Sequence, residues 1–143
     1  MFEHILFPTD GSDPAGQALD AALEIAVKFD ATLHVLSAVE VVPYPEFPDM
    51  ATVREQETER AKDIVEEARN KATAEGLAVE SRIVQEIDPY QAIENYLDEH
   101  DIDLIVMGTH GRSGLERLLL GSTTERTLRT ADIPVLSVPM KNE

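Results

Sequence analysis

The chain has 143 residues, 43% of them hydrophobic, which is enough for a substantial core, and its lack of cysteine excludes disulfides, thiolate catalysis and thiolate zinc sites. Asp and Glu number 28 against 12 Lys and Arg, and the net charge of −16 argues against nucleic acid or an anionic membrane as a partner, since both attract an excess of Lys and Arg. No apolar run approaches the roughly 20 residues that span a bilayer, so we expect a soluble, cytoplasmic protein.

Five short apolar runs have the character of buried parallel strands. They cover residues 5–10, 32–42, 79–84, 102–107 and 134–139. The first run ends at Asp10-Gly11-Ser12, and the fourth is followed by Gly108-Thr109-His110-Gly111. Two of the five predicted strands therefore end in turn-forming or glycine-containing sequences.

Helical spacing of apolar residues separates these runs. The first helix is predicted to have Asp13 as its cap and Pro14 at its first position, and Asp88-Pro89 repeats this start for the third. A charged second helix covers residues 54–76, and a fourth covers 123–130. The second helix has one apolar stripe, formed by Ala61, Ile64, Val65, Ala68 and Ala72. Its acidic residues are expected to form a solvated face: Glu55, Glu57, Glu59, Glu66 and Glu67.

Strands and helices thus alternate along residues 1–143, which predicts one α/β domain with a doubly wound, Rossmann-like open parallel sheet and helices on both faces. Such sheets bind ligands beyond the carboxyl ends of the strands, where the winding reverses. With strand order 3-2-1-4-5, that point lies between Thr9-Asp10 and Met107-Gly108.

The glycine spacing after the fourth strand indicates a phosphate site. Gly108-x-x-Gly111 is followed, after nine residues, by Gly121-Ser122 at the start of a helix. Glycines at a strand exit let backbone N–H groups approach an anion, and the first turn of a helix adds N–H donors and partial positive charge.

The segments Pro8-Thr9-Asp10-Gly11-Ser12, His34-Val35, Met107 to Gly114 and Gly121 to Glu125 together resemble the universal stress protein family over essentially the whole chain. The Gly-x2-Gly-x9-Gly-Ser/Thr spacing is similar to the pattern of its ATP-binding members. The resemblance implies strand order 3-2-1-4-5. It also implies a homodimer that pairs through the fifth strand, from Pro134 to Pro139. Ile87 is a departure, because many members have glycine two residues before the proline.

The resemblance also implies a role for each pocket residue. Asp10 would accept hydrogen bonds from the ribose hydroxyls. The residues that would enclose the adenine are Pro8, Thr9, Val35, Ala38 and Met107. The residues that would hold the phosphates through N–H and hydroxyl donors are Gly108, Gly111, Gly121, Ser122, Thr123 and Thr124. His110 and Arg112 would help to neutralise the charge of the phosphates.

Each assignment has a simpler alternative. Asp10 before glycine is also a typical turn residue, and the glycines could only tighten a strand-to-helix connection. Arg112 could be a solvated loop charge, and His110 an ordinary loop histidine. The remaining histidines, His4, His34 and His100, have no metal-ligand spacing.

The chain has no P-loop lysine motif, no kinase motif set, no His-Glu-x-x-His and no serine nucleophile elbow. We therefore expect a regulatory protein of the stress response that binds ATP, alone or with Mg²⁺, with ADP and AMP as alternative ligands, and that acts on a protein partner the sequence does not identify. Two other hypotheses remain: the protein is a slow ATPase or nucleotidyl-transfer enzyme, or it is an interaction module whose glycine loop is purely structural.

The acidic composition includes only four lysines: Lys28, Lys62, Lys71 and Lys141. Such a composition is typical of a salt-rich, halophilic cytoplasm, where ions screen charge repulsion within a few Å. An ordinary acidic protein is the alternative.

Overall fold

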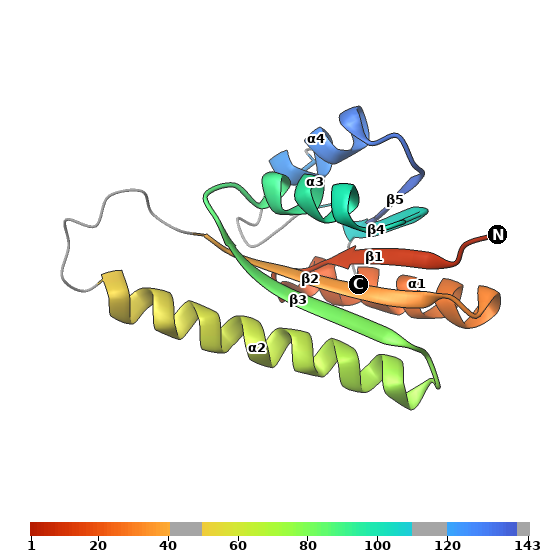
Figure 1. Cartoon of the computed structure of the whole chain (residues 1–143), viewed down its shortest axis with the longest axis horizontal. Helices are drawn as coiled ribbons and strands as arrows, with labels where there is room; N and C mark the ends of the chain where they lie inside the picture. The colour runs from red at the N-terminus through yellow and green to blue at the C-terminus, as the bar shows by residue number, and fades with distance from the viewer. Residues whose placement is uncertain (41–49, 110–119, 140–143) are drawn as a thin grey trace.

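A computed structural model describes residues 1–40, 50–109 and 120–139, and in it five strands form one parallel sheet (Figure 1). The strands are β1 (His4–Pro8), β2 (Thr32–Glu40), β3 (Val79–Glu86), β4 (Leu104–Gly108) and β5 (Val135–Val138). Their order is β3-β2-β1-β4-β5, with every neighbouring pair parallel. The predicted doubly wound sheet and its strand order are confirmed.

Four helices cover the two faces of this sheet. They are α1 (Asp13–Phe29), α2 (Met50–Ala74), α3 (Pro89–Glu99) and α4 (Ser122–Thr130), with α1 and α2 on one face and α3 and α4 on the other (Figure 1). Because side chains alternate along a strand, Ile5 and Phe7 join the core under α1 and α2, whereas Leu6 joins the core under α3. The three central residues of β1 are buried, so β1 contributes to the centre of both cores.

Helix starts agree with the sequence prediction at α3 and differ by one residue at α1. Asp88 caps α3, and its Oδ1 accepts the Tyr90 N–H at 3.1 Å. At α1 the cap is Ser12 instead of Asp13: the Ser12 hydroxyl accepts the Ala15 N–H at 3.4 Å, a bond that the preceding turn sets up. The turn at Ile87 forms without glycine, and Ile87 is 66% exposed there.

Other element ends differ modestly. The helix α2 begins at Met50, before the predicted position 54, and β3 continues past the predicted Val84 to Glu86. Residues 41–42, predicted to end the second strand, lie outside the described residues.

The turn between β1 and α1 is fixed against α2 by Gly11. This residue has a positive φ of +77°, and a Cβ added to it would lie 2.5 Å from Ile64 Cδ1. The positive φ favours glycine here, and any larger residue would also have to displace the Ile64 side chain. The turn that contains Asp10 is therefore held close to the middle of α2.

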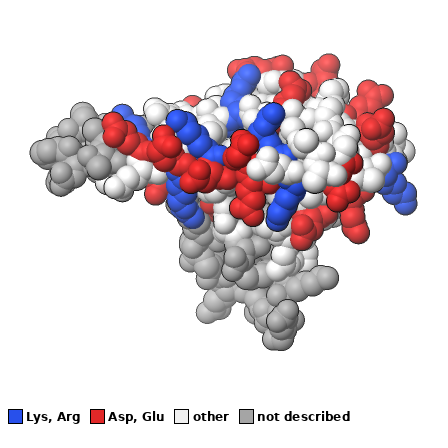
Figure 2. All heavy atoms as spheres, turned by 90° about the horizontal axis from the view of Figure 1, so that it is seen from below, with Lys and Arg blue, Asp and Glu red and all other residues white. Residues whose placement is uncertain are grey.

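Acidic and basic side chains are interleaved on the face that α2 covers (Figure 2). Lys62 pairs with Glu59 at 3.1 Å and Lys71 with Glu67 at 3.8 Å. The predicted solvated acidic face is confirmed for Glu55, Glu59, Glu66 and Glu67, which are exposed, but not for the half-buried Glu57. Among the described residues, no helix combines the length and the apolar character needed to cross a membrane.

Candidate functional site

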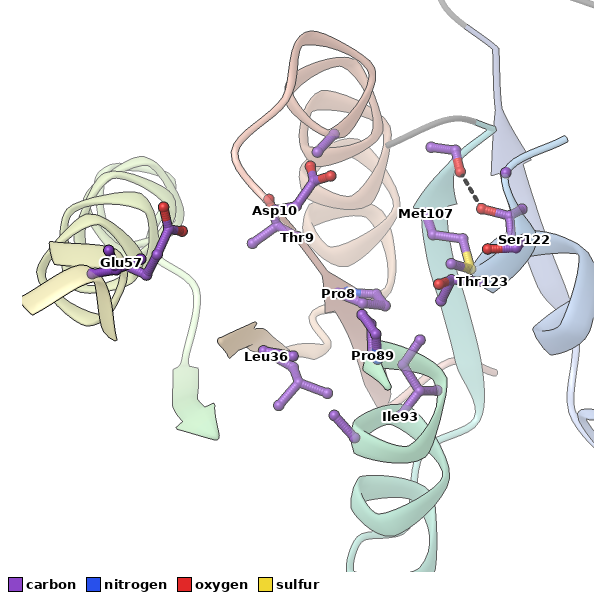
Figure 3. A pocket seen from close by; sticks show the side chains of 17 residues that line it. Pro8, Thr9, Asp10, Leu36, Glu57, Pro89, Ile93, Met107, Ser122 and Thr123 are labelled. Atoms are coloured by element: carbon purple, nitrogen blue, oxygen red, sulfur yellow. Dashed lines mark hydrogen bonds between the residues drawn. The ribbon is translucent and has the colours of Figure 1, made fainter. Parts of the chain in front are cut away.

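A cavity of about 590 Å³ lies at the carboxyl ends of β1, β2 and β4 (Figure 3). In this strand order the winding reverses between β1 and β4, which is where open parallel sheets bind ligands. Small-molecule sites typically have ~300–1,000 Å³. The cavity therefore has the place and the size of a ligand site.

Most of the apolar lining comes from β1, β2, β4 and the first turns of α3, and Ala15 of α1 and Val53 of α2 complete it. The residues of the larger part are Pro8, Leu36, Ala38, Pro89, Ala92, Ile93 and Met107. Leu36 and Ile93 are each only 2% exposed, so both are held in the core and present a fixed surface to the cavity. Figure 3 shows Pro8, Leu36, Pro89 and Ile93 grouped together below Asp10. This surface suits a flat, largely apolar group.

Backbone bonds fix the exit of β1. The Thr9 N–H donates to the Leu36 carbonyl at 2.9 Å, and the Gly11 N–H donates to Thr9 Oγ1 at 3.1 Å. The Ser12 N–H donates to Asp10 Oδ1 at 2.9 Å, which makes Asp10 the side-chain acceptor of an Asx turn. Asp10 also lines the cavity. The turn role and the pocket position, which the sequence presented as alternatives, therefore coexist in one residue.

The opposite wall is built from the end of β4 and the start of α4. The Thr124 hydroxyl donates to the Gly108 carbonyl at 2.8 Å, and the Gly121 N–H donates to the Thr109 carbonyl at 2.7 Å. The first intrahelical bond of α4 runs from the Glu125 N–H to the Gly121 carbonyl at 2.9 Å. The N–H groups of residues 122–124 therefore have no carbonyl acceptor within the helix and carry the positive end of its dipole.

These bonds change the expected donor set. We predicted N–H and hydroxyl donors from the whole Gly121 to Thr124 segment, but the Gly121 N–H and the Thr124 hydroxyl proton are already used to join α4 to β4. Ser122 and Thr123, in the first turn of α4, line the cavity from this side (Figure 3).

The helix α2 contributes a side of the pocket that the sequence did not reveal. Val53 and Glu57 line the cavity, and Glu57 extends toward it from α2 (Figure 3). Helical periodicity could have placed Glu57 beside the apolar stripe, since it lies four residues before Ala61. No local signal indicates that the start of α2 reaches the carboxyl edge of the sheet.

Most predicted site residues lie together around the cavity. Those that line it are Pro8, Thr9, Asp10, Ala38, Met107, Gly108, Gly121, Ser122, Thr123 and Thr124. Val35 does not: it is fully buried in the core under α1 and α2. The period of two along β2 turns Leu36 and Ala38 toward the cavity and Val35 away from it. His110, Gly111 and Arg112 lie outside the described residues.

The cavity separates two kinds of polar group. In Figure 3, Glu57 and Ser122 lie on opposite sides, with Asp10 between them. Glu57 and the central Asp10 thus supply carboxylates, which accept hydrogen bonds, and the Ser122 side carries hydroxyls and the donor end of a helix. No group of three or more acidic or histidine side chains in the described part of the chain could hold a metal ion. The arrangement suits a ligand with hydroxyl donors at one end and an anion at the other.

Residues 1–139 match the model of the universal stress protein family. The chain belongs to the universal stress protein family. A universal stress protein of Methanocaldococcus jannaschii, MJ0531, is 33% identical over 141 residues, which is 96% of this chain and 82% of the relative.

Solved structures of the family have the same fold. The structure of MJ0577, another Methanocaldococcus jannaschii universal stress protein, is 29% identical with a TM-score of 0.91 and covers 100% of this chain and 99% of its own. A universal stress protein solved in complex with cAMP is 29% identical with a TM-score of 0.75, covering 98% of this chain and 99% of its own.

Proposed function

We propose that this universal stress protein binds an adenine nucleotide, ATP in the first place and ADP or AMP as alternatives, and that the bound nucleotide regulates its interaction with other proteins. The observation that carries the proposal is the cavity at the β1–β4 switch point, with Asp10 on one side and the start of α4 on the other. The family member in complex with cAMP gives independent support.

The chemistry of the cavity suggests how the ligand lies. The adenine packs on Leu36, Ile93 and the neighbouring apolar residues, because a flat ring buries well on this surface. Asp10 accepts hydrogen bonds from the ribose hydroxyls, since a carboxylate is an acceptor only. The phosphates lie at the first turn of α4, near Ser122 and Thr123, where N–H groups and the helix dipole favour an anion.

The sequence motif extends this phosphate site beyond the described residues. Gly111 lies at the spacing expected for a phosphate contact, and His110 and Arg112 lie on either side of it. We include these residues in the proposal on the motif alone. ATP is proposed to bind with or without Mg²⁺. The acidic, cysteine-free composition supports a cytoplasmic location.

The two edges of the sheet support a homodimer that pairs through β5. The edge strand β3 is long and carries exposed charges, including Glu80 and Arg82, which discourage strand pairing. The other edge strand, β5, has the uncharged sequence VLSV, and its Leu136 is 39% exposed. A short apolar edge flanked by Pro134 and Pro139 favours a closed two-fold pair over an open fibre.

Calorimetric titration of the full chain with ATP, ADP, AMP and GTP, in buffer of about 1 M salt to screen the charge, tests the function. We expect saturable binding of one adenine nucleotide per chain, with GTP weaker, and little nucleotide turnover during the experiment. Absence of binding by any of them would overturn the proposal in favour of an interaction module. Release of product at several turnovers per minute would instead favour a slow ATPase.

A further inference from the structure

Three histidines distant in the sequence meet at the amino ends of the strands, at the opposite edge of the sheet from the nucleotide pocket. The cluster consists of His4 on β1, His34 on β2, Tyr96 on α3 and His100 just after α3, and we refer to it as the histidine cluster. His34 is its centre and is only 2% exposed. Nothing in the proposed nucleotide site uses these residues.

Hydrogen bonds link the cluster in a line. His4 Nδ1 lies 3.0 Å from His34 Nε2, and His34 Nδ1 lies 2.7 Å from the Tyr96 hydroxyl. The His100 ring stacks on Tyr96 with centroids 3.8 Å apart and also lies 5.7 Å from the His34 ring. Both ring nitrogens of His34 are therefore engaged, one toward β1 and one toward α3.

The hydrogen bond between His4 and His34 is compatible with at most one of the two rings being protonated. With both imidazoles neutral, or with one of them protonated, one nitrogen of the His4–His34 contact can donate and the other can accept. When both are protonated, two N–H groups and two positive charges face each other across 3.0 Å. The contact between His4 and His34 must then break.

The charged groups around His34 do not remove the repulsion between two protonated rings. Burial lowers the pKa of His34; the nearby Glu80 raises it, His4 and His100 lower it further, and Asp103 raises it. Glu80 Oε2 is 3.6 Å from His34 Nε2, but its side chain is 60% exposed, so solvent screens this interaction. Arg82 lies 5.4 Å from the Tyr96 ring on the α3 side, but its charge is offset by Glu99, whose Oε2 lies 2.5 Å from Arg82 Nη1.

The cluster is connected to the nucleotide pocket through α3. Tyr96 is buried at 3% exposure and lies one helical turn from Ala92 and Ile93, which line the pocket. The same helix is thus held against the sheet at its C-terminal end by the histidine cluster and forms a pocket wall at its N-terminal end.

We propose that the histidine cluster is an acid-sensitive control of the nucleotide pocket: a second proton on the His4–His34 pair separates the two rings, loosens α3 from the sheet and weakens nucleotide binding. Burial and the neighbouring His4 and His100 lower the pKa of His34, so the second proton binds on the acidic side of the ordinary histidine value of 6.5. The inference rests on the proposed nucleotide function for its effect on affinity, but the loosening of α3 can be measured without a ligand.

The test compares wild type with His4→Asn, whose side-chain amide takes the place of Nδ1 and does not titrate. Amide hydrogen exchange of α3, corrected for intrinsic rates, and ATP affinity are both measured from about pH 7.5 to about pH 5.5. In wild type we expect α3 exchange to accelerate on acidification and ATP affinity to fall at least about fivefold more than in the variant. The variant is the reference because the ATP phosphates titrate in the same range.

Asp98→Asn is the matched control, because Asp98 is an exposed residue of α3 outside the histidine cluster. We expect it to keep the wild-type pH response. Equal pH responses of α3 exchange in wild type and His4→Asn would overturn the inference, whether or not ATP binds. If ATP fails to bind at every pH while α3 exchange responds as expected, the proposed function fails and the acid-sensitive cluster stands.

Discussion

At the scale of single residues, Asp10 combines a folding role with its proposed ligand role. Its Oδ1 accepts the Ser12 N–H at 2.9 Å, and the side chain also lines the cavity. Replacement by alanine would remove both roles at once and could not separate them. Asparagine keeps a side-chain oxygen acceptor for Ser12 and loses only the negative charge.

We predict that Asp10→Asn weakens ATP binding about tenfold or more, since a hydrogen bond to a charged group contributes ~1.5–3 kcal/mol. The melting temperature of the ligand-free protein should stay close to that of wild type, whereas Asp10→Ala should lower it. Calorimetry and thermal unfolding check the two effects separately. Wild-type affinity in Asp10→Asn would restrict Asp10 to the turn.

His34 makes the stability of the fold depend on pH. Its pKa is lowered from the usual 6.5, mainly by burial, so the unfolded chain binds a proton there more readily than the folded chain. The cost of keeping His34 neutral is absent above about pH 6.5 and grows as the pH falls through that value. We therefore expect a steeper loss of stability on acidification in wild type than in His34→Gln, measured by urea unfolding between about pH 7.5 and 6. Parallel curves would contradict this account.

At the scale of elements, the start of α3 and the alternation of strands and helices could be predicted from local sequence, whereas the start of α2 at Met50 could not. Asp88-Pro89 predicts the cap of α3 because the cap bond joins residues that are neighbours in the chain. The direction of Val35 could not be predicted in the same way, because β2 is buried on both faces and its polar residues His34 and Ser37 do not mark a solvent-facing side. The position of Glu57 depends on where a long helix crosses the sheet edge, which is a tertiary property.

The cap of α3 gives a direct stability prediction. Asp88 accepts the Tyr90 N–H through Oδ1, and its Oδ2 lies 2.5 Å from Arg126 Nη1. We predict that Asp88→Ala lowers the free energy of unfolding by ~1 kcal/mol through loss of the cap. Arg126→Ala should cost less, because an exposed ion pair contributes ~0–1 kcal/mol. Denaturant unfolding of both variants checks the order, and an equal or larger loss in Arg126→Ala would contradict it.

The start of α4 allows a test in which stability and binding move in opposite directions. An aspartate at Ser122 would interact favourably with the positive helix end, adding ~0.3–1 kcal/mol to stability, but it would repel a phosphate in the same place. We predict that Ser122→Asp lowers ATP affinity more than about tenfold without loss of stability. Ser122→Asn, the neutral control, should bind ATP much more tightly than the aspartate variant. Equal affinities of the two would place the phosphates elsewhere.

At the scale of the whole molecule, the net charge of −16 and the apolar β5 edge act in opposite directions on assembly. Repulsion between subunits extends farther at low salt, where the Debye length grows from ~3 Å at 1 M to ~30 Å at 0.01 M. We predict a homodimer at high salt that dissociates as salt is diluted. Sedimentation velocity at tens of micromolar protein checks this, and a monomer at molar salt would rule out the dimer.

One residue of β5 offers a way to disrupt the proposed dimer without unfolding the subunit. Val135 and Val138 pack partly against the protein's own core, whereas Leu136 is 39% exposed at the edge. Leu136→Asp should therefore dissociate the dimer at any salt without unfolding the subunit. Val27→Asp is the control, because Val27 is 47% exposed near the end of α1 and is not part of β5. Dissociation by both variants would point to a general charge effect.

The central claim is that an adenine nucleotide binds at the carboxyl edge of β1 and β4 with its phosphates at the start of α4. Amide NMR of the full chain during titration with ATP measures this directly. We predict saturable shifts at Thr9, Gly108 and Ser122, and none at Gly76, which ends the turn after α2 at the opposite edge of the sheet. Saturable shifts confined to residues outside the cavity, or no shifts at all, would contradict the account.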